Sequence, residues 1–246
     1  MRPIAHRGCL TQYPENTLAA FRGAAPHVGM IETDVRRCGS GELVIFHDDT
    51  LDRVTDATGE VASTPMAVLE DVSILGSEEP IPRLTEVLET VPEDVGLNLE
   101  LKGRDVATET VAVAAEYDHE VVVSSFYPDD VAAARDAGAE TTAHLYYAEE
   151  PVDFDVEAAV AAAADLGCAY VHPDVDSCLE TDVVEEAHDR GVGVNAWTAE
   201  TESEVLELRA RGVDGAVIND CRFAAVCRSG RRLHELDDED AGEPQG

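Results

Sequence analysis

The sequence predicts an α/β protein folded as a closed (β/α)8 TIM barrel, and three observations lead to this class. Short runs rich in β-branched residues alternate with Ala-, Glu- and Leu-rich segments of helical spacing. Close to eight such strand–helix units fit into 246 residues, a length typical of a single barrel. Several helical segments end at a glycine, the usual stop signal. An open doubly wound sheet is the alternative, but the chain has no Gly-x-Gly-x-x-Gly or phosphate-loop motif.

The expected elements follow in chain order. Strands are expected over Pro3–His6, Met30–Val35, Leu43–Phe46, Gly96–Leu101, Val121–Ser124, Thr142–Tyr146, Ala169–His172, Val192–Trp197 and Gly215–Ile218. Helices are expected over Asp105–Tyr117, Asp129–Ala137, Val156–Leu166, Thr181–Arg190 and Glu202–Arg211. Turn signals dominate residues 47–82, which we interpret as a small insertion after the second barrel strand. We expect residues 1–228 to form the barrel and the acidic residues 229–246 to form a disordered tail.

Acidic residues outnumber basic ones by 52 to 17, which gives a formal net charge of −35. This excess disfavours nucleic-acid binding, because the phosphates would be repelled. The acids are spread along the whole chain, which favours a salt-adapted, halophilic protein over one with a single acidic patch for a basic partner. No apolar run is long enough for a transmembrane helix, and no signal peptide precedes the first strand. We therefore expect a cytoplasmic protein without membrane insertion, whose six cysteines are reduced thiols.

Two expected strands carry charged side chains at alternate positions, whereas barrel strands are usually apolar on both faces. Glu32 and Asp34 share one face of their strand, and Glu100 and Lys102 share one face of the next barrel strand. An antiparallel strand with one solvated face would also explain the alternation of leucines with Glu100 and Lys102. In a barrel the polar face points inward, where carboxylates repel one another unless a cation lies between them. Glu32, Asp34 and Glu100 are therefore candidate ligands of a hard cation, Mg²⁺ or Ca²⁺.

Histidines and basic residues accompany these acids. His6 and His47 each follow or end an expected strand, at the face where barrels hold their active sites. Two imidazoles suit paired acid and base roles, because histidine titrates near neutrality. Arg7 and Lys102, the single lysine of the chain, together with a dication outweigh the charge of the three carboxylates. Such a site is locally positive and suits an anionic ligand such as a phosphate diester.

These residues resemble the glycerophosphodiester phosphodiesterase family (the GDPD domain), through an ordered set of motifs between residues 3 and about 220. The motifs are His6-Arg7-Gly8, Pro14-Glu15-Asn16-Thr17, Glu32-Thr33-Asp34, Val44-Ile45-Phe46-His47-Asp48 with Leu51, Arg53 and Thr55, Glu100-Leu101-Lys102, Ser125-Phe126, Asn195-Ala196-Trp197-Thr198, Asp214-Gly215 and Asn219-Asp220. After the last strand the family often has Thr-Asp-x-Pro, where this chain has Asn219-Asp220-Cys221-Arg222. We expect this departure to loosen the final loop and to leave the chemistry intact.

The resemblance implies a (β/α)8 barrel with an insertion and metal-dependent hydrolysis of small glycerophosphodiesters to an alcohol and glycerol phosphate. It implies that Glu15 braces the histidine loop. The roles it implies are metal ligands Glu32, Asp34 and Glu100, catalytic His6 and His47, and substrate-binding Arg7, Lys102 and Trp197.

Two other functions compete with this one. A phospholipase-D-like enzyme on intact lipids would need an apolar rim, which 5% aromatic residues and an acidic surface disfavour. A non-catalytic phosphate-binding barrel is disfavoured because every matching position is filled. The alcohol headgroup, the substrate stereochemistry, the metal, the attacking oxygen, the acid and base assignment and the oligomeric state stay open.

Overall fold

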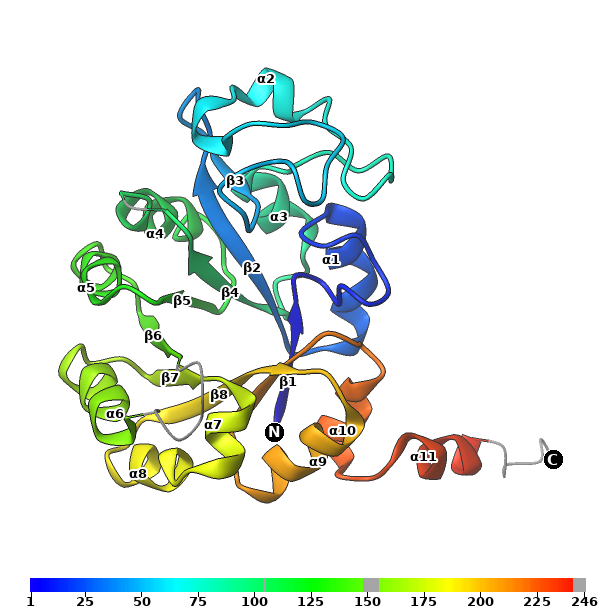
Figure 1. Cartoon of the computed structure of the whole chain (residues 1–246), viewed down its shortest axis with the longest axis vertical. Coiled ribbons are helices and arrows are strands. Elements are labelled where there is room, and N and C mark those ends of the chain that lie inside the picture. Colours follow the sequence, from blue (N-terminus) through cyan, green and yellow to red (C-terminus); the bar gives the residue numbers. More distant parts are fainter. Residues whose placement is uncertain (104, 148–154, 241–246) are drawn as a thin grey trace.

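Eight parallel strands form a closed ring in the computed structural model, which describes residues 1–103, 105–147 and 155–240 (Figure 1). The ring closes because the first strand pairs with both the second and the last. The ring strands are β1 (Arg2–His6), β2 (Met30–Arg37), β4 (Gly96–Leu101), β5 (Val121–Ser125), β6 (Thr141–Tyr146), β7 (Tyr170–Pro173), β8 (Gly193–Ala199) and β9 (Gly215–Ile218). The predicted (β/α)8 barrel is confirmed.

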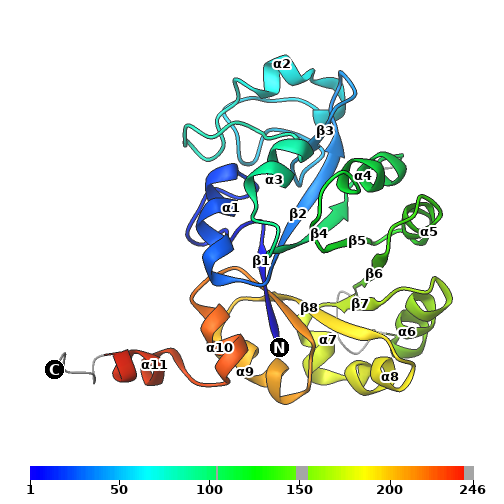
Figure 2. The same cartoon turned by 180° about the vertical axis from the view of Figure 1, so that it is seen from behind.

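Helices surround the ring on its outer side (Figures 1 and 2). They are α1 (Leu18–Ala24) with η1 (Ala25–His27), α3 (Leu84–Thr90), α4 (Ala107–Ala114), α5 (Pro128–Asp136), α6 (Val156–Asp165), α7 (Val175–Glu180), α8 (Val183–Asp189), α9 (Glu202–Ala210) and α10 (Phe223–Ser229). Helices α3, α7 and α10 were not predicted; α7 begins because Asp174 accepts hydrogen bonds from the Ser177 backbone N–H (2.9 Å) and hydroxyl (2.6 Å). Within the described ranges, no helix is long and apolar enough to cross a membrane.

Strand alternation divides the barrel core into two clusters. Ile4, Met30 and Val122 belong to the cluster inside the ring. Leu97 and Leu99 pack outward against the helices. Because side chains alternate along β4, the polar residues between and after these leucines face the inside of the ring.

The chain leaves the ring between β2 and α3. Strand β3 (Leu43–Ile45) pairs antiparallel with the carboxyl end of β2. The following residues 47–82 contain only η2 (Val61–Ser63) and α2 (Met66–Leu69) as helical segments. They share an apolar cluster of their own with β3, which is formed by Cys38, Val44, Phe46, Leu51, Val54, Val61, Met66, Leu69, Val72, Ile74 and Ile81. The insertion therefore packs on the end of β2 where the predicted site lies.

The segment expected to be a disordered acidic tail contains a helix, α11 (Leu233–Asp240), that projects away from the barrel (Figure 2). Its start is anchored, because Arg232 forms an ion pair of 3.3 Å with Glu202 of α9. The rest of the expected tail, residues 241–246, lies outside the described residues.

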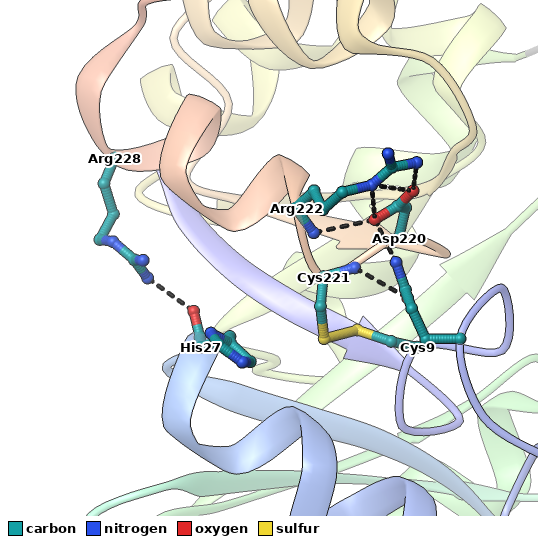
Figure 3. The surroundings of a disulfide bond; sticks show 7 residues. Cys9, His27, Asp220, Cys221, Arg222 and Arg228 are labelled. Carbon is teal, nitrogen blue, oxygen red and sulfur yellow. Dashed lines mark hydrogen bonds and ion pairs between the residues drawn. A yellow bond between two sulfur atoms is a disulfide. The ribbon is translucent and has the colours of Figure 1, made fainter. Parts of the chain in front are cut away.

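The expectation of six reduced thiols is wrong for one pair. Cys9, after β1, and Cys221, after β9, form a disulfide with Cα atoms 5.6 Å apart (Figure 3). The two residues are 212 positions apart in the sequence. They meet because β1 and β9 are neighbours in the ring, so the loops that follow them lie side by side. The other cysteines are free and buried, namely Cys38, Cys168, Cys178 and Cys227.

Candidate active site

Three buried carboxylates lie together at the carboxyl ends of β2 and β4. Glu32 and Asp34 face the inside of the ring, because Met30 on the same face of β2 belongs to the inner cluster. Asp34 is directly paired in register with Glu100. One oxygen from each of the three carboxylates lies within 4.8 Å of the others, and no second such group of potential metal ligands occurs among the described residues. The structure thus brings the three predicted cation ligands into one cluster.

The crowding of these acids changes their proton affinities. Burial and the nearby charges of Asp34 and Glu100 raise the pKa of Glu32 well above its usual value. Burial likewise raises the pKa of Glu100 to about 7. Burial opposes ionisation of Asp34 too, but the charges of Lys102 and Arg7 outweigh it and lower the pKa of Asp34 to about 2.

The donor set fits a hard divalent cation. Oε1 of Glu32 is buried and has no hydrogen-bond partner. Oδ1 of Asp34 and Oε1 of Glu100 also accept no hydrogen bond of good geometry, although each forms an ion pair with the ammonium of Lys102. Buried carboxylate oxygens without donors are costly unless a cation compensates them, and Mg²⁺ and Ca²⁺ take oxygen ligands of this kind.

Two basic side chains face the same carboxylates from the mouth of the barrel. Nζ of Lys102 lies 3.4 Å from Oδ1 of Asp34 and also contacts the Glu100 carboxylate. Nε of Arg7 lies 3.2 Å from the other oxygen of Asp34. Both side chains are mostly buried but still reach solvent. Positive charge is therefore available directly beside the candidate cation site.

A second set of side chains holds Arg7 and Asp34 in place. Glu15 accepts a hydrogen bond of 2.8 Å from Arg7 and two more, of 2.8 and 2.9 Å, from Arg53 of the insertion. Asn16 donates to Oδ2 of Asp34 over 2.8 Å. Its φ of 59° is a left-handed conformation that asparagine tolerates better than most residues. The prediction that Glu15 braces the histidine loop is confirmed by its contact with Arg7.

His6 ends β1 beside the carboxylate cluster. It is paired in register with Glu32, and its Nε2 lies 3.9 Å from Oε2 of that residue. On the opposite edge of the imidazole, Nδ1 of His6 lies 2.6 Å from Oδ1 of Asn219. Burial, and to a lesser extent the charge of Arg7, lower the pKa of His6 to about 4. The imidazole is consequently neutral near pH ~7.

His47 enters the same mouth from the start of the insertion. Its Nδ1 lies 2.6 Å from Oδ1 of Asp48, and its carbonyl accepts two hydrogen bonds from Arg36, of 2.7 and 2.9 Å. Burial lowers the pKa of His47, while the charge of Asp34 opposes this shift. The backbone N–H of Phe46, the residue before His47, donates to the carbonyl of Asp34 over 2.9 Å, so both predicted histidines lie near the carboxylates.

Aromatic rings line the mouth on the side of β5, β6 and β8. Trp197 lies edge-on to Phe126 at 5.5 Å between ring centroids and 6.1 Å from Tyr147. Its indole N–H donates to the carbonyl of His172 over 2.8 Å. Nζ of Lys102 lies 5.6 Å from the centre of the Phe126 ring. Trp197 therefore adjoins the charged cluster through Phe126 and Lys102.

A pocket of about 550 Å³ leads to Lys102 from outside. Its lining includes Arg36 and Arg37 of β2, Thr50 of the insertion and Tyr127 after β5, so β2, the insertion and the loop after β5 contribute to its walls. Lys102 is the only predicted site residue in this lining, and it is the contacts described above that place the predicted residues at one end of the barrel.

Sequence reasoning missed three groups at this mouth, namely Tyr147, the His172 carbonyl and the contact of Asn219 with His6. Only Asn219 carried a signal, because it departs from the family motif.

Comparison with known proteins agrees with this geometry. The model of the "Glycerophosphoryl diester phosphodiesterase family" matches residues 6–222. The chain is 30% identical to a glycerophosphodiester phosphodiesterase of Caldanaerobacter subterraneus, over 88% of this chain and 93% of that protein. It is also similar to a phosphodiesterase of Oleispira antarctica whose structure holds the product sn-glycerol-3-phosphate, with 30% identity, a TM-score of 0.80 and coverage of 94% and 96% of the two chains. A glycerophosphodiester phosphodiesterase of Thermotoga maritima shares the fold, with a TM-score of 0.80, 24% identity and coverage of 93% and 98%.

Proposed function

Since the chain belongs to the glycerophosphoryl diester phosphodiesterase family and is an enzyme of that kind, we propose that it hydrolyses soluble glycerophosphodiesters to an alcohol and glycerol phosphate with a divalent cation and two histidines. One observation carries the proposal. Three buried carboxylates, two basic side chains and two imidazoles meet at one end of the barrel. This combination suits the transfer of a phosphoryl group.

Glu32, Asp34 and Glu100 would hold the cation, Mg²⁺ or Ca²⁺. The unpartnered oxygen of Glu32 and the burial that raises the pKa of Glu100 support this role, because a bound cation would offset the cost of holding carboxylate charge inside the barrel. When bound, such a cation supplies positive charge to phosphoryl oxygens and lowers the pKa of a nearby hydroxyl.

Arg7 and Lys102 would bind the remaining phosphate oxygens. A guanidinium presents a fork of N–H donors and an ammonium a compact charge, and both suit a phosphate diester. Glu15 fixes the orientation of Arg7, so that this guanidinium is positioned before the substrate arrives.

His6 and His47 would form the acid–base pair. One imidazole would take the proton from the attacking oxygen, and the other would give a proton to the leaving alcohol. Both rings are fixed at Nδ1, by Asn219 and Asp48 respectively, which leaves Nε2 of each ring for the substrate.

Trp197 would contact the glycerol or the leaving alcohol, because its ring lies next to Phe126 and hence to Lys102. Tyr127 and Tyr147 are each 55% exposed at this mouth. This pair is the observation that favours the second candidate, a phospholipase-D-like activity on intact lipids, because exposed tyrosines suit a membrane interface.

We also propose that the chain is adapted to high salt, and that residues 1–228, including the insertion 47–82, form one domain followed by the segment 229–246. The 52 acids against 17 bases support the first point, because molar salt shortens the Debye length to ~3 Å and relieves the self-repulsion. The cytoplasmic location stays a prediction. The Cys9–Cys221 disulfide weighs against it, since reducing compartments keep most thiols free.

Product release from a panel of glycerophosphodiesters tests the function. Each substrate is incubated with EDTA, Mg²⁺ or Ca²⁺ at low and high salt, and alcohol and glycerol phosphate are quantified. We expect turnover with a cation and none with EDTA, with higher activity at high salt. Liposomes of intact lipid form a parallel arm, and Glu32→Gln is the matched variant without a complete ligand set. Turnover in EDTA would contradict the metal requirement, and faster release from liposomes would favour the lipid enzyme.

A further inference from the structure

The loop after β9 touches the histidine at the end of β1, although the sequence predicted a loosened loop here. The two side chains meet where Oδ1 of Asn219 lies 2.6 Å from Nδ1 of His6. An amide oxygen only accepts hydrogen bonds, so Nδ1 must carry the hydrogen. The lone pair of the neutral ring is then on Nε2, the nitrogen that faces the carboxylates at 3.9 Å from Glu32.

Several contacts hold this loop against the loop after β1. The disulfide joins Cys9 to Cys221, two residues after Asn219 (Figure 3). The backbone N–H of Thr11 donates to the carbonyl of Asn219 over 3.1 Å. Gln12 accepts from the N–H of Cys221 over 3.2 Å. The position of Asn219 is therefore fixed by the segment that directly follows His6.

In the loop after β9, Arg222 occupies the position where the family often has a proline, and it forms an ion pair with Asp220. The Arg222 guanidinium donates to both oxygens of Asp220, with Nε at 3.1 and 3.0 Å (Figure 3). Gln12 also donates to this carboxylate. The expectation that the Asn219-Asp220-Cys221-Arg222 sequence loosens the loop is therefore wrong.

The disulfide links the two loops that carry His6 and Asn219, because Cys9 lies three residues after His6 and Cys221 two residues after Asn219. On one side, the N–H of Cys9 donates to the carbonyl of His6 over 2.9 Å. On the other side, Cys221 follows Asn219 in the same tight loop. Cys9 is 0% and Cys221 9% exposed, so the bond lies inside the protein between the two loops. A covalent link of this kind limits how far the amide and the imidazole can move apart.

We propose that Asn219 is a positioning residue that holds His6 in the Nδ1–H tautomer, and that the Cys9–Cys221 disulfide keeps Asn219 in place. The proposal rests on the role of His6 in the proposed function. A neutral imidazole exchanges its hydrogen between both nitrogens, and only an acceptor at Nδ1 keeps the lone pair on Nε2. The proposal thereby gives His6 the role of the base. Without that acceptor, part of the enzyme carries a hydrogen on Nε2 and cannot take a proton from the substrate there. A wrong histidine tautomer costs up to ~10⁴-fold in kcat in a hydrolase that depends on a comparable contact.

Two substitutions at one position test the contact. Asn219→Leu keeps the approximate volume but removes the acceptor, whereas Asn219→Asp keeps an acceptor oxygen. We expect Asn219→Leu to lower kcat at least ~10²-fold with little change in KM, and Asn219→Asp to stay within ~10-fold of wild type. Wild-type kcat in Asn219→Leu would overturn the proposal, and so would an equal loss in both variants. Thermal unfolding of each variant separates a loss of folding from a loss of positioning.

The tautomer itself is read by ¹⁵N NMR of the side chains, with the His6 signals assigned by comparison with His6→Gln. Wild type should show hydrogen on Nδ1 and a free Nε2, and Asn219→Leu should show a mixture. An unchanged tautomer in Asn219→Leu would overturn the proposal. This measurement uses no substrate, so a failure of the proposed function leaves it valid.

Reduction tests the part assigned to the disulfide. One dithiothreitol molecule gives up two electrons and two protons and becomes a cyclic disulfide, and Cys9 and Cys221 become thiols. We expect the reduced wild-type enzyme to lose at least ~10-fold in kcat and to show the mixed tautomer. The Cys9→Ser/Cys221→Ser variant should be impaired from the start and unaffected by dithiothreitol. Full activity of the reduced enzyme, once a thiol assay shows that the bond has opened, would refute the holding role.

Discussion

Replacing Glu100 by glutamine should stabilise the protein when no divalent cation is present. The carboxylate of Glu100 is buried beside Asp34, and burial raises its pKa from 4.5 to about 7. The folded state therefore binds this proton more tightly than the unfolded state does, and ionisation opposes folding. Glutamine has nearly the same shape and never ionises, so Glu100→Gln escapes this cost.

The magnitude follows from the difference between the two pKa values of Glu100, 4.5 unfolded and about 7 folded. Each pKa unit corresponds to ~1.4 kcal/mol, so ionised Glu100 lowers the free energy of unfolding by about 3 kcal/mol at pH ~8. The cost is fully present above the folded pKa and shrinks as the pH falls toward the unfolded value, to below ~1 kcal/mol near pH ~5. For a chain of this size, about 3 kcal/mol corresponds to a shift in Tm of roughly 6–12 °C.

Urea unfolding and thermal unfolding followed by circular dichroism, in EDTA at pH ~5 and ~8, measure this difference. Mg²⁺ or Ca²⁺ should reverse the order, because wild type keeps three carboxylate ligands and Glu100→Gln only two. The exposed Glu93→Gln removes one charge elsewhere and controls for the effect on net charge. The reasoning would be refuted if Glu100→Gln were no more stable than wild type in EDTA at pH ~8, or if the difference persisted near pH ~5.

Alanine at either His6 or His47 should lower kcat at least ~10²-fold, because one proton transfer then lacks its donor or acceptor. Steady-state kinetics check this, and wild-type turnover in one variant would remove that histidine from the acid–base pair. Lys102→Met should raise KM and lower kcat for glycerophosphodiesters, because a charge that would contact the phosphate is lost; unchanged constants would leave Lys102 a structural role only. Gly8→Ala should cost ~1–3 kcal/mol in urea unfolding, because φ is +80° there and an added Cβ would lie 2.7 Å from the Cβ of Ala20. A wild-type unfolding midpoint would contradict this steric argument.

The carboxylate cluster could be predicted from the sequence because its signal is local. Side chains alternate with a period of two along a strand, so Glu32 and Asp34 had to share one face. The sequence also distinguished the inner face of β4, since leucines occupy all its outward positions. In the barrel β2 and β4 are parallel neighbours, and their register pairs Asp34 with Glu100.

The contacts between the loops after β1 and β9, where the barrel closes, could not be predicted in the same way. Cys9 and Cys221 are separated by 212 residues, and Asn219 is equally remote from His6. Their contact depends on the orientation of two irregular loops, which strand periodicity does not determine. A motif that lost its proline therefore indicated a loose loop, although a disulfide and an ion pair hold it.

The charges at the mouth link the binding of cation and substrate. The positive site predicted from the sequence depends on the dication, because Arg7 and Lys102 are both paired with Asp34, at 3.2 and 3.4 Å. With the three carboxylates ionised, these five groups carry one net negative charge, which repels a diester anion. A dication changes that sum to one net positive charge. At an effective dielectric constant of ~20, each unit charge ~5 Å from the phosphate is worth about 3 kcal/mol. In a chain of net charge −35, these carboxylates thus repel the substrate when they are ionised without a cation, whereas the cation that they would hold favours its binding.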